Sequence, residues 1–162
     1  MIIGVLSDTH IPNAATRMPQ QVLDAFKKAD MVVHAGDIID LPTLEQLKSV
    51  CARVLAVRGN MDHDEIKKIL PEREIFKVKD FKIVVVHGWG APASLLAQLE
   101  LTFKNDRPDI VIFGHTHSPL NEKRGDTLYF NPGSPTDKVF SPYNSYGIIE
   151  INNKIEARII KL

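Results

Sequence analysis

The stretch IVIFGHTH, residues 110–117, decides how the rest of the chain is interpreted. Its first four residues are apolar and mostly β-branched, which is typical of a short buried strand, and Gly114 ends the run. His115 and His117 follow at alternate positions, where the side chains of an extended segment point the same way. If the backbone stays extended, both imidazoles face one site and form half of a metal cage. The other ligands have to come from elsewhere in the chain.

The composition is that of an ordinary soluble globular protein. The chain has 162 residues, of which 44% are hydrophobic and 25% charged, and 20 basic side chains balance 20 acidic ones. This length favours one domain over residues 1–162. The even charge balance predicts neither nucleic-acid nor membrane binding. No apolar run is long enough for a transmembrane helix, no signal-peptide pattern is present, and the single cysteine fits a reducing compartment, so we expect a cytoplasmic protein.

Apolar runs alternate with helical periodicities in the first half of the chain, and strands dominate the second half. We expect strands at residues 2–6, 31–35, 53–57, 74–79, 82–86, 110–113, 128–130, 146–151 and 155–160. We expect helices at residues 19–29, 42–50, 64–70 and 92–104. This order predicts an α/β fold in layers, with parallel strands early and antiparallel strands late.

Polar motifs follow five of the predicted strands. They contain Asp8 with His10, then Asp37, Asn60, His87, and finally His115 with His117. Taken singly, a histidine after a strand is most often a hydrogen-bonded structural residue, and an aspartate after glycine is most often a turn former or helix cap. Because ligands gather beyond the carboxyl ends of parallel strands, the whole set favours a metal site built from nitrogen and oxygen ligands.

The motifs also resemble those of a known family. Asp-x-His, Gly-Asp, Gly-Asn-x-Asp, His-Gly and Gly-His-Thr-His, in this order, resemble the five blocks of calcineurin-like metallophosphoesterases. The short chain and the Asn-Pro-Gly-Ser loop at 131–134 are similar to the small bacterial and archaeal branch, which includes phosphodiesterases and is related to a retromer scaffold subunit of eukaryotes. The resemblance implies a two-sheet β-sandwich flanked by helices on both sides.

The resemblance further implies two divalent metal ions. One would be held by Asp8, His10 and His117, the other by Asn60, His87 and His115, and Asp37 would bridge them. Asp37, Asn60, His87 and His115 are then also the catalytic positions. Carboxylate, amide and imidazole ligands suit manganese, which we expect first, or nickel, iron, cobalt or zinc, rather than calcium. Two such ions outweigh the charge of the two carboxylates and a bridging hydroxide, so the site can attract phosphate.

The activity implied is phosphodiester hydrolysis by in-line attack of the metal-bridging hydroxide on a small phosphoester. One alternative is a phosphomonoesterase acting on a small metabolite. Another is a non-catalytic protein-binding scaffold on the same fold, although a scaffold has no need for seven competent ligands. The apolar pair Val139-Phe140 leaves room for a homo-oligomer.

For five other residues the sequence leaves the role open or argues against a role in the metal site. Met61 stands where many family members have a histidine that protonates the leaving group, so we expect slower turnover and a preference for good leaving groups. Asp62 is either a helix cap or a support for the ligands. For His34 we favour a hydrogen-bonded strand residue. Asn131 is either a turn former or a support near the metals. Trp89 either walls a substrate pocket or packs against its neighbours.

Overall fold

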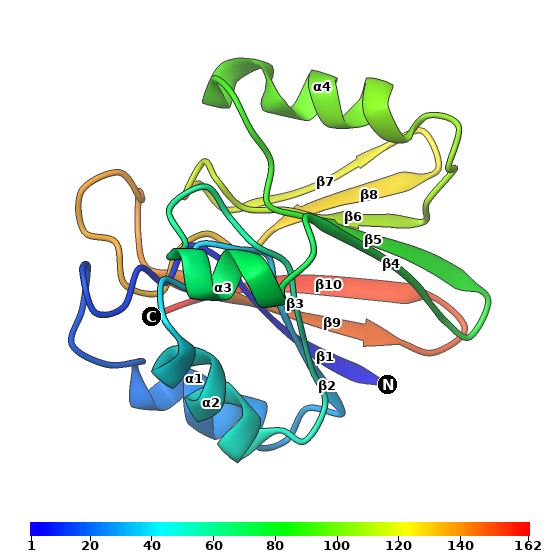
Figure 1. The fold of residues 1–162 in the computed structure, drawn as a ribbon. Helices are drawn as coiled ribbons and strands as arrows, with labels where there is room; N and C mark the ends of the chain where they lie inside the picture. The colour runs from blue at the N-terminus through cyan, green and yellow to red at the C-terminus, as the bar shows by residue number, and fades with distance from the viewer.

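The computed structural model describes residues 1–162 and contains two five-stranded sheets (Figure 1). The first sheet has the order β10-β9-β1-β2-β3. Its strands are β1 (Ile2–Leu6), β2 (Met31–His34), β3 (Val54–Ala56), β9 (Ser145–Ile151) and β10 (Ile155–Lys161). β1, β2 and β3 run parallel, whereas β9 and β10 form the predicted antiparallel hairpin and join the sheet beside β1.

The second sheet has the order β4-β5-β6-β8-β7. Its strands are β4 (Arg73–Val78), β5 (Phe81–Val86), β6 (Ile110–Ile112), β7 (Leu120–Arg124) and β8 (Thr127–Asn131). β5, β6 and β8 are parallel, and the antiparallel strands β4 and β7 form the two edges. The antiparallel part expected late in the chain is present, and β8 belongs to it through β7 while it also pairs parallel with β6. Strand β7 was not predicted, because its sequence LNEKR lacks an apolar run.

The two sheets pack against each other through alternate residues of the apolar runs. Ile3 and Val5 of β1, and Ile83 and Val85 of β5, lie in the buried cluster between the sheets. The intervening residues face outward and are buried under helices, as expected for strands with both faces covered. This arrangement confirms the predicted sandwich.

Helices cover both outer faces (Figure 1). α1 (Gln20–Phe26) and α2 (Leu41–Val50) lie together against the first sheet, and α4 (Pro92–Phe103) lies against the second. The short α3 (Asp64–Ile69) follows β3. Gly4 allows α1 to pack closely, because a Cβ atom there would lie 2.6 Å from the ring of Phe26. None of the four helices has the length and apolar character needed to cross a membrane.

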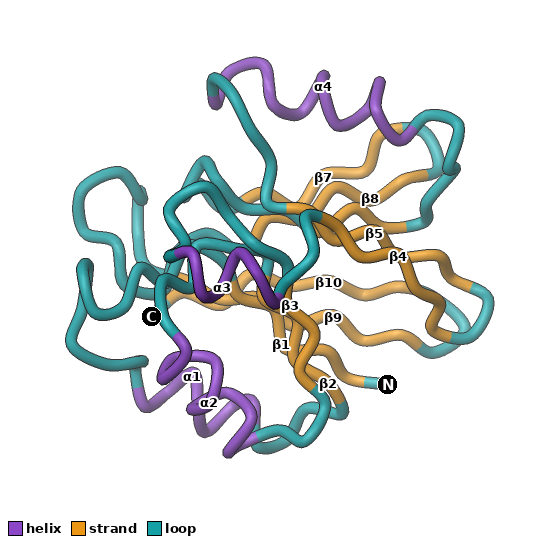
Figure 2. Tube along the Cα trace, viewed as in Figure 1, coloured by secondary structure: helices purple, strands orange, loops and turns teal.

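Most of the longer loops gather at one end of the two sheets (Figure 2). The loops after β1, β2, β5 and β6 are joined there by backbone hydrogen bonds. Asp8 N–H donates to Gly36 O over 3.0 Å, His10 N–H to Asp37 O over 3.1 Å, and Gly114 N–H to His87 O over 3.0 Å. These loops hold all the predicted metal ligands except Asn60, which follows β3.

The packing of α4 predicts a contrast between two leucines on that helix. Leu99 is fully buried, whereas Leu101 is 77% exposed. Leu99→Ala leaves a cavity and is expected to lower the free energy of unfolding by about 2–5 kcal/mol, whereas Leu101→Ala should change it by less than about 0.5 kcal/mol. Urea unfolding of the two variants measures both values. Equal effects would contradict the packing of α4 on the second sheet.

Candidate metal centre

The seven residues predicted as ligands lie together at the carboxyl ends of β1, β2, β3, β5 and β6. Asp8, His10 and His117 form one group. His10 Nε2 lies 3.2 Å from His117 Nε2, and Asp8 Oδ1 lies 3.3 Å from His117 Nε2. Two imidazole nitrogens bound to one ion at ~2.1 Å lie about 3 Å apart, so this spacing fits a shared ion. These three residues offer ligand atoms close enough to hold one metal ion.

The other residues form an adjacent group. Asn60 Oδ1 lies 3.1 Å from both His87 Nε2 and His115 Nδ1. Asp37 Oδ2 lies 3.3 Å from His87 Nε2 and 3.5 Å from His10 Nε2. Asp37 thus lies between the two groups, in contact range of a histidine from each.

Three of the imidazoles are fixed by a partner on the nitrogen that faces away from the cluster. His87 Nδ1 donates to Ala35 O over 2.8 Å, and His115 Nε2 donates to Gly90 O over 2.8 Å. His117 Nδ1 donates to the carboxylate of Asp137. With the outer nitrogen protonated, the neutral ring presents a lone pair on its inner nitrogen, which is the arrangement of metal-bound histidines. The donor set therefore fits a pair of divalent cations.

The two carboxylates at the centre are buried and need positive charge. Asp8 is fully buried and Asp37 is 2% exposed. Burial opposes their ionisation, but the facing His117 and His87 outweigh it and lower the pKa of both carboxyls. Burial also opposes protonation of the histidines, but Asp37 and Asp8 raise the pKa of His87 to about 9.

His117 responds in the same way, because Asp8 and Asp137 outweigh its burial and raise its pKa to about 9. In the metal-free protein, protons on these rings supply the positive charge that the carboxylates require. Divalent cations can replace those protons at the inner nitrogens.

The backbone that carries the ligands is not extended, which corrects the expected geometry of His115 and His117. Five of the seven residues have left-handed backbone angles, with φ of 54° at Asp8, 43° at His10, 58° at Asp37, 68° at His115 and 55° at His117. Non-glycine residues in this region cost of order 1 kcal/mol or more each, and such strain concentrates at functional sites. The turn sends His115 toward Asn60 and His117 toward Asp8, so the two rings join different groups.

Two glycines of the motifs are required by close approach to the ligands. A Cβ atom on Gly59 would lie 2.1 Å from Asp37 Oδ1, and one on Gly114 would lie 1.7 Å from Ser7 Oγ and 2.7 Å from Asp8 Oδ2. Because real Cβ contacts are never this short, any side chain here would displace a carboxylate.

Asp62 supports the cluster and does not cap a helix, so the capping alternative was wrong. The N-cap of α3 is His63. The buried Asp62 carboxylate accepts hydrogen bonds from Ile39 N–H at 2.7 Å and Gly59 N–H at 2.6 Å. It ties the loop after β3 to the loop after β2. An aspartate carboxylate can accept either from the N–H groups of a helix start or from those of a neighbouring loop. In Asp62 the loop N–H groups occupy it.

His34 is a hydrogen-bonded strand residue, as predicted. It is fully buried, and burial lowers its pKa to about 3, so the ring is neutral. Gly36 N–H donates to its Nδ1 over 3.2 Å, and its Nε2 lies 3.1 Å from Thr9 Oγ1. Because Nδ1 accepts, Nε2 carries the proton and donates to Thr9.

Asn131 combines both alternatives. Its Nδ2 donates to Gly114 O over 2.9 Å, and its Oδ1 accepts from Gly133 N–H over 2.9 Å. It is therefore a turn former that also anchors the loop after β6. Ser134 continues this support by donating to Asp8 O over 2.7 Å.

The sequence interpretation missed Asp137. This aspartate accepts from His117 Nδ1 and also from the backbone N–H groups of Val139, Phe140 and Ser141. It thereby fixes both the ring of the predicted ligand His117 and the following loop. The only sequence signal is an aspartate in a polar loop three residues after Ser134.

A cavity of about 550 Å³, the metal cavity, opens onto the cluster. Its lining includes five of the predicted ligands, namely His10, Asp37, Asn60, His115 and His117. Met61 and Phe140, 55% and 75% exposed, add an apolar rim. Val139, the other member of the exposed apolar pair, does not line it.

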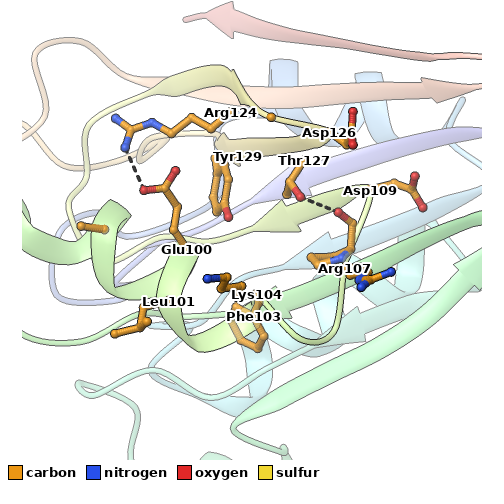
Figure 3. A pocket seen from close by; sticks show the side chains of 13 residues that line it. Glu100, Leu101, Phe103, Lys104, Arg107, Asp109, Arg124, Asp126, Thr127 and Tyr129 are labelled. Carbon is orange, nitrogen blue, oxygen red and sulfur yellow. Dashed lines mark hydrogen bonds and ion pairs between the residues drawn. The ribbon is translucent and has the colours of Figure 1, made fainter.

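A larger cavity of about 770 Å³ lies away from the cluster, between α4 and the β7–β8 hairpin (Figure 3). None of the seven predicted ligands lines it. Two of its polar contacts are marked in Figure 3. Arg124 pairs with Glu100 at 3.1 Å, and Thr127 Oγ1 donates to Pro108 O over 2.7 Å.

The chain belongs to the calcineurin-like phosphoesterase superfamily. The family model for the calcineurin-like phosphoesterase superfamily domain matches residues 1–154. A probable metallophosphoesterase from Methanocaldococcus jannaschii is 39% identical over all of this chain and 82% of its own length. These matches confirm the predicted family and enzyme class, a metal-dependent phosphoesterase.

Two solved structures resemble the whole fold. An archaeal phosphodiesterase superposes with a TM-score of 0.80 at 27% identity, covering 100% of both chains. Vps29 from Entamoeba histolytica in complex with Zn²⁺ superposes with a TM-score of 0.78 at 26% identity, covering 99% of both chains. The chain therefore resembles both a hydrolase and a protein named for vacuolar sorting.

The contact between Asp137 and His117 predicts a loss of metal affinity on substitution. Asp137→Asn removes the charge that orients the ring and raises its basicity, and such changes typically weaken metal binding about 10–100-fold. Titration of metal-stripped protein with Mn²⁺ by calorimetry measures the affinity. Asp126→Asn, an exposed aspartate in the β7–β8 turn, is the matched control. Unchanged affinity in the Asp137 variant would contradict its role.

Proposed function

We propose that this protein is a dinuclear metal-dependent phosphodiesterase. The observation that carries the proposal is that His87, His115 and His117 are each held through the outer nitrogen. The inner nitrogens of His87 and His117 then face the buried carboxylates of Asp37 and Asp8, and that of His115 faces Asn60 Oδ1. Imidazole lone pairs beside buried carboxylates repel one another, and bound cations offset this cost.

The proposed ligand sets follow the two groups of residues. Asp8, His10 and His117 hold one ion, and Asn60, His87 and His115 hold the other. Asp37 bridges the two, because its Oδ2 lies within 3.5 Å of His10 Nε2 and within 3.3 Å of His87 Nε2. Manganese is the metal we propose, with nickel, iron, cobalt or zinc as alternatives that the same ligands accept. The Zn²⁺ complex of the similar Vps29 supports a divalent ion at this fold.

Hydrolysis adds the oxygen of water to phosphorus and breaks the ester bond to the leaving alcohol. When bound, the two ions supply the activated water for in-line attack and neutralise the charge that develops on the phosphoryl oxygens. The residues of the chain fix the geometry. Asp62 holds the loop of Asn60, Asp137 holds His117, and the hydrogen bond to Gly90 holds His115.

Many members of the family carry, directly after the Gly-Asn pair, a histidine that protonates the leaving group. Met61 occupies that position, lines the metal cavity, and donates its backbone N–H to Asp37 Oδ1 over 2.7 Å. A thioether cannot donate a proton, so leaving groups that depart as stable anions should react fastest.

Diesters are favoured over monoesters by the similarity to an archaeal phosphodiesterase over the full length of both chains. A protein-binding scaffold is the alternative that the likeness to Vps29 raises. The strained backbone at five ligand positions argues against it, since strain is retained at a site where a function requires it.

Loss of Asp37 tests the proposed chemistry. Metal-stripped protein is assayed on bis(p-nitrophenyl) phosphate before and after addition of Mn²⁺. Mn²⁺ should restore hydrolysis, and Asp37→Asn should lower kcat/KM at least about 100-fold, because it removes the charge shared between the two ions.

The matched control is Asp80→Asn, an exposed aspartate in the β4–β5 turn, which should keep full activity. A parallel assay with p-nitrophenyl phosphate ranks diester against monoester. Absence of activity with Mn²⁺, Ni²⁺, Co²⁺ and Zn²⁺ alike would contradict the enzyme and favour the scaffold.

The methionine at the rim generates a separate prediction. Met61→His introduces an imidazole beside the leaving group, and a positioned general acid contributes typically 10²–10⁴-fold. Hydrolysis of methyl phenyl phosphate, which has a poor leaving group, should rise relative to that of methyl p-nitrophenyl phosphate by about tenfold or more. Met61→Gln, similar in size but without a titratable group, is the control. An unchanged ratio in the histidine variant would show that Met61 does not face the leaving group.

A further inference from the structure

A second cavity lies beside the metal cavity, and its chemistry differs. This Trp89 cavity has a volume of about 540 Å³ and is lined by residues of the loop after β3, the start of β4, the loop after β5 and the end of α4. Asn60 lines both cavities, and the Trp89 cavity also reaches His87. The two cavities therefore adjoin each other at Asn60, beside the candidate metal centre.

Trp89 is an exposed ring on a fixed loop. Its side chain is 44% exposed, although its neighbours in sequence are tied to the metal centre. His87 is a proposed ligand, and Gly90 O accepts the hydrogen bond from His115 Nε2 over 2.8 Å. Gly88 and Gly90 have φ of 101° and 79°, conformations open to glycine, so the loop makes a tight double bend around the tryptophan. A rigidly held aromatic face in a cavity is a stacking surface.

Arg73 is the unpaired cation of the same cavity. Arg58, the other arginine in the lining, is engaged, because it donates to Lys67 O over 2.8 Å and pairs with Glu72 at 2.5 Å. Arg73 is exposed and forms no ion pair or side-chain hydrogen bond. It is paired in the sheet with Val86, the residue before His87, and neighbouring strands lie about 4.8 Å apart. The charges of Arg58 and Glu72 cancel, which leaves the positive charge of Arg73.

We propose that the Trp89 cavity is the subsite for the substituent of the diester that remains on phosphorus, and that it selects a planar ring with a further negative charge. The ring lies against Trp89, and the anionic group pairs with Arg73. The inference rests on the proposed function and names the class of substrate for it. A volume of 540 Å³ is within the range of small-molecule sites, so a group of nucleotide size can be accommodated.

Three p-nitrophenyl esters with the same leaving group test this selectivity. They are methyl p-nitrophenyl phosphate, the p-nitrophenyl ester of thymidine 5′-phosphate, and the same nucleotide ester with an added 3′-phosphate. Stacking of a base on an aromatic side chain and a charge-assisted contact to arginine are each worth about tenfold or more. In the wild type, kcat/KM should therefore rise about tenfold at each step of this series.

Two substitutions separate the contributions. Trp89→Leu should abolish most of the gain from methyl to nucleotide ester, and Arg73→Gln should abolish the gain from the added phosphate. Arg53→Gln, an exposed arginine before β3 that does not line the cavity, should keep both ratios. Ratios in the two cavity variants equal to those of the wild type would overturn the subsite, even if hydrolysis of the methyl ester upholds the phosphodiesterase.

A binding measurement covers the case in which the proposed function itself fails. If no ester is hydrolysed, calorimetry with thymidine 3′,5′-bisphosphate and Mn²⁺-loaded protein tests the cavity alone. Binding weakened about tenfold or more by Arg73→Gln, but not by Arg53→Gln, would support the subsite on a protein without the activity. Equal binding by all three proteins, or no binding, would overturn it.

Discussion

The structure depends on two carboxylates, Asp8 and Asp37, that are buried at the place where the two sheets end. Burying negative charge is costly unless positive charge is placed beside it. The nearest side chains that can carry positive charge are imidazoles from loops of both sheets, with His117 Nε2 3.3 Å from Asp8 and His87 Nε2 3.3 Å from Asp37. Imidazoles supply that charge only when protonated, whereas divalent cations supply more of it at the same nitrogens. The need of these carboxylates for cations links the fold to its chemistry.

The need to gather these groups around the carboxylates explains where the backbone is strained and which hydrogen bonds hold it. The predicted ligands come from the ends of five strands, so the loops must bend sharply to bring their side chains together. The left-handed backbone at Asp8, Asp37 and His117 is the result. Residues outside the predicted ligand set hold these bends by hydrogen bonds. Gly59 N–H donates to the Asp62 carboxylate, and Ser134 Oγ donates to Asp8 O. Two sheets packed on a shared apolar core provide the rigid frame that this requires.

Two cavities of different character, the metal cavity and the Trp89 cavity, lie beside the candidate metal centre. On one side, Met61 and Phe140 give the metal cavity an apolar rim. On the other side, Trp89 and Arg73 give the adjoining cavity an aromatic face and a free positive charge. A phosphodiester carries two substituents, and the centre offers a different environment for each. Divalent metals are implied for the whole family, and we propose that these rims are where this chain distinguishes one ester from another.

The apolar runs were sufficient to predict the layered α/β fold, because continuous runs mark strands buried on both faces. The polar motifs after five of these runs predicted that the seven residues gather at one site. The two-sheet sandwich was implied by the resemblance to the family. The sequence was insufficient where partners are set by tertiary contacts. β7 is a polar edge strand recognisable only by its pairing with β8. Asp62 was compatible with a cap until the loop donors were known. Asp137 has no motif, and its role follows from the position of His117. The extended geometry expected for His115 and His117 failed because the loop turns immediately after Gly114.

The central claim is that two cations lie between the buried carboxylates and the inward-facing nitrogens. The most direct measurement is an anomalous difference map from a crystal of Mn²⁺-loaded protein, recorded at the manganese absorption edge. The account predicts two peaks on either side of Asp37, one beside Asp8, His10 and His117 and one beside Asn60, His87 and His115. A single peak, or peaks that avoid Asp37, would contradict it.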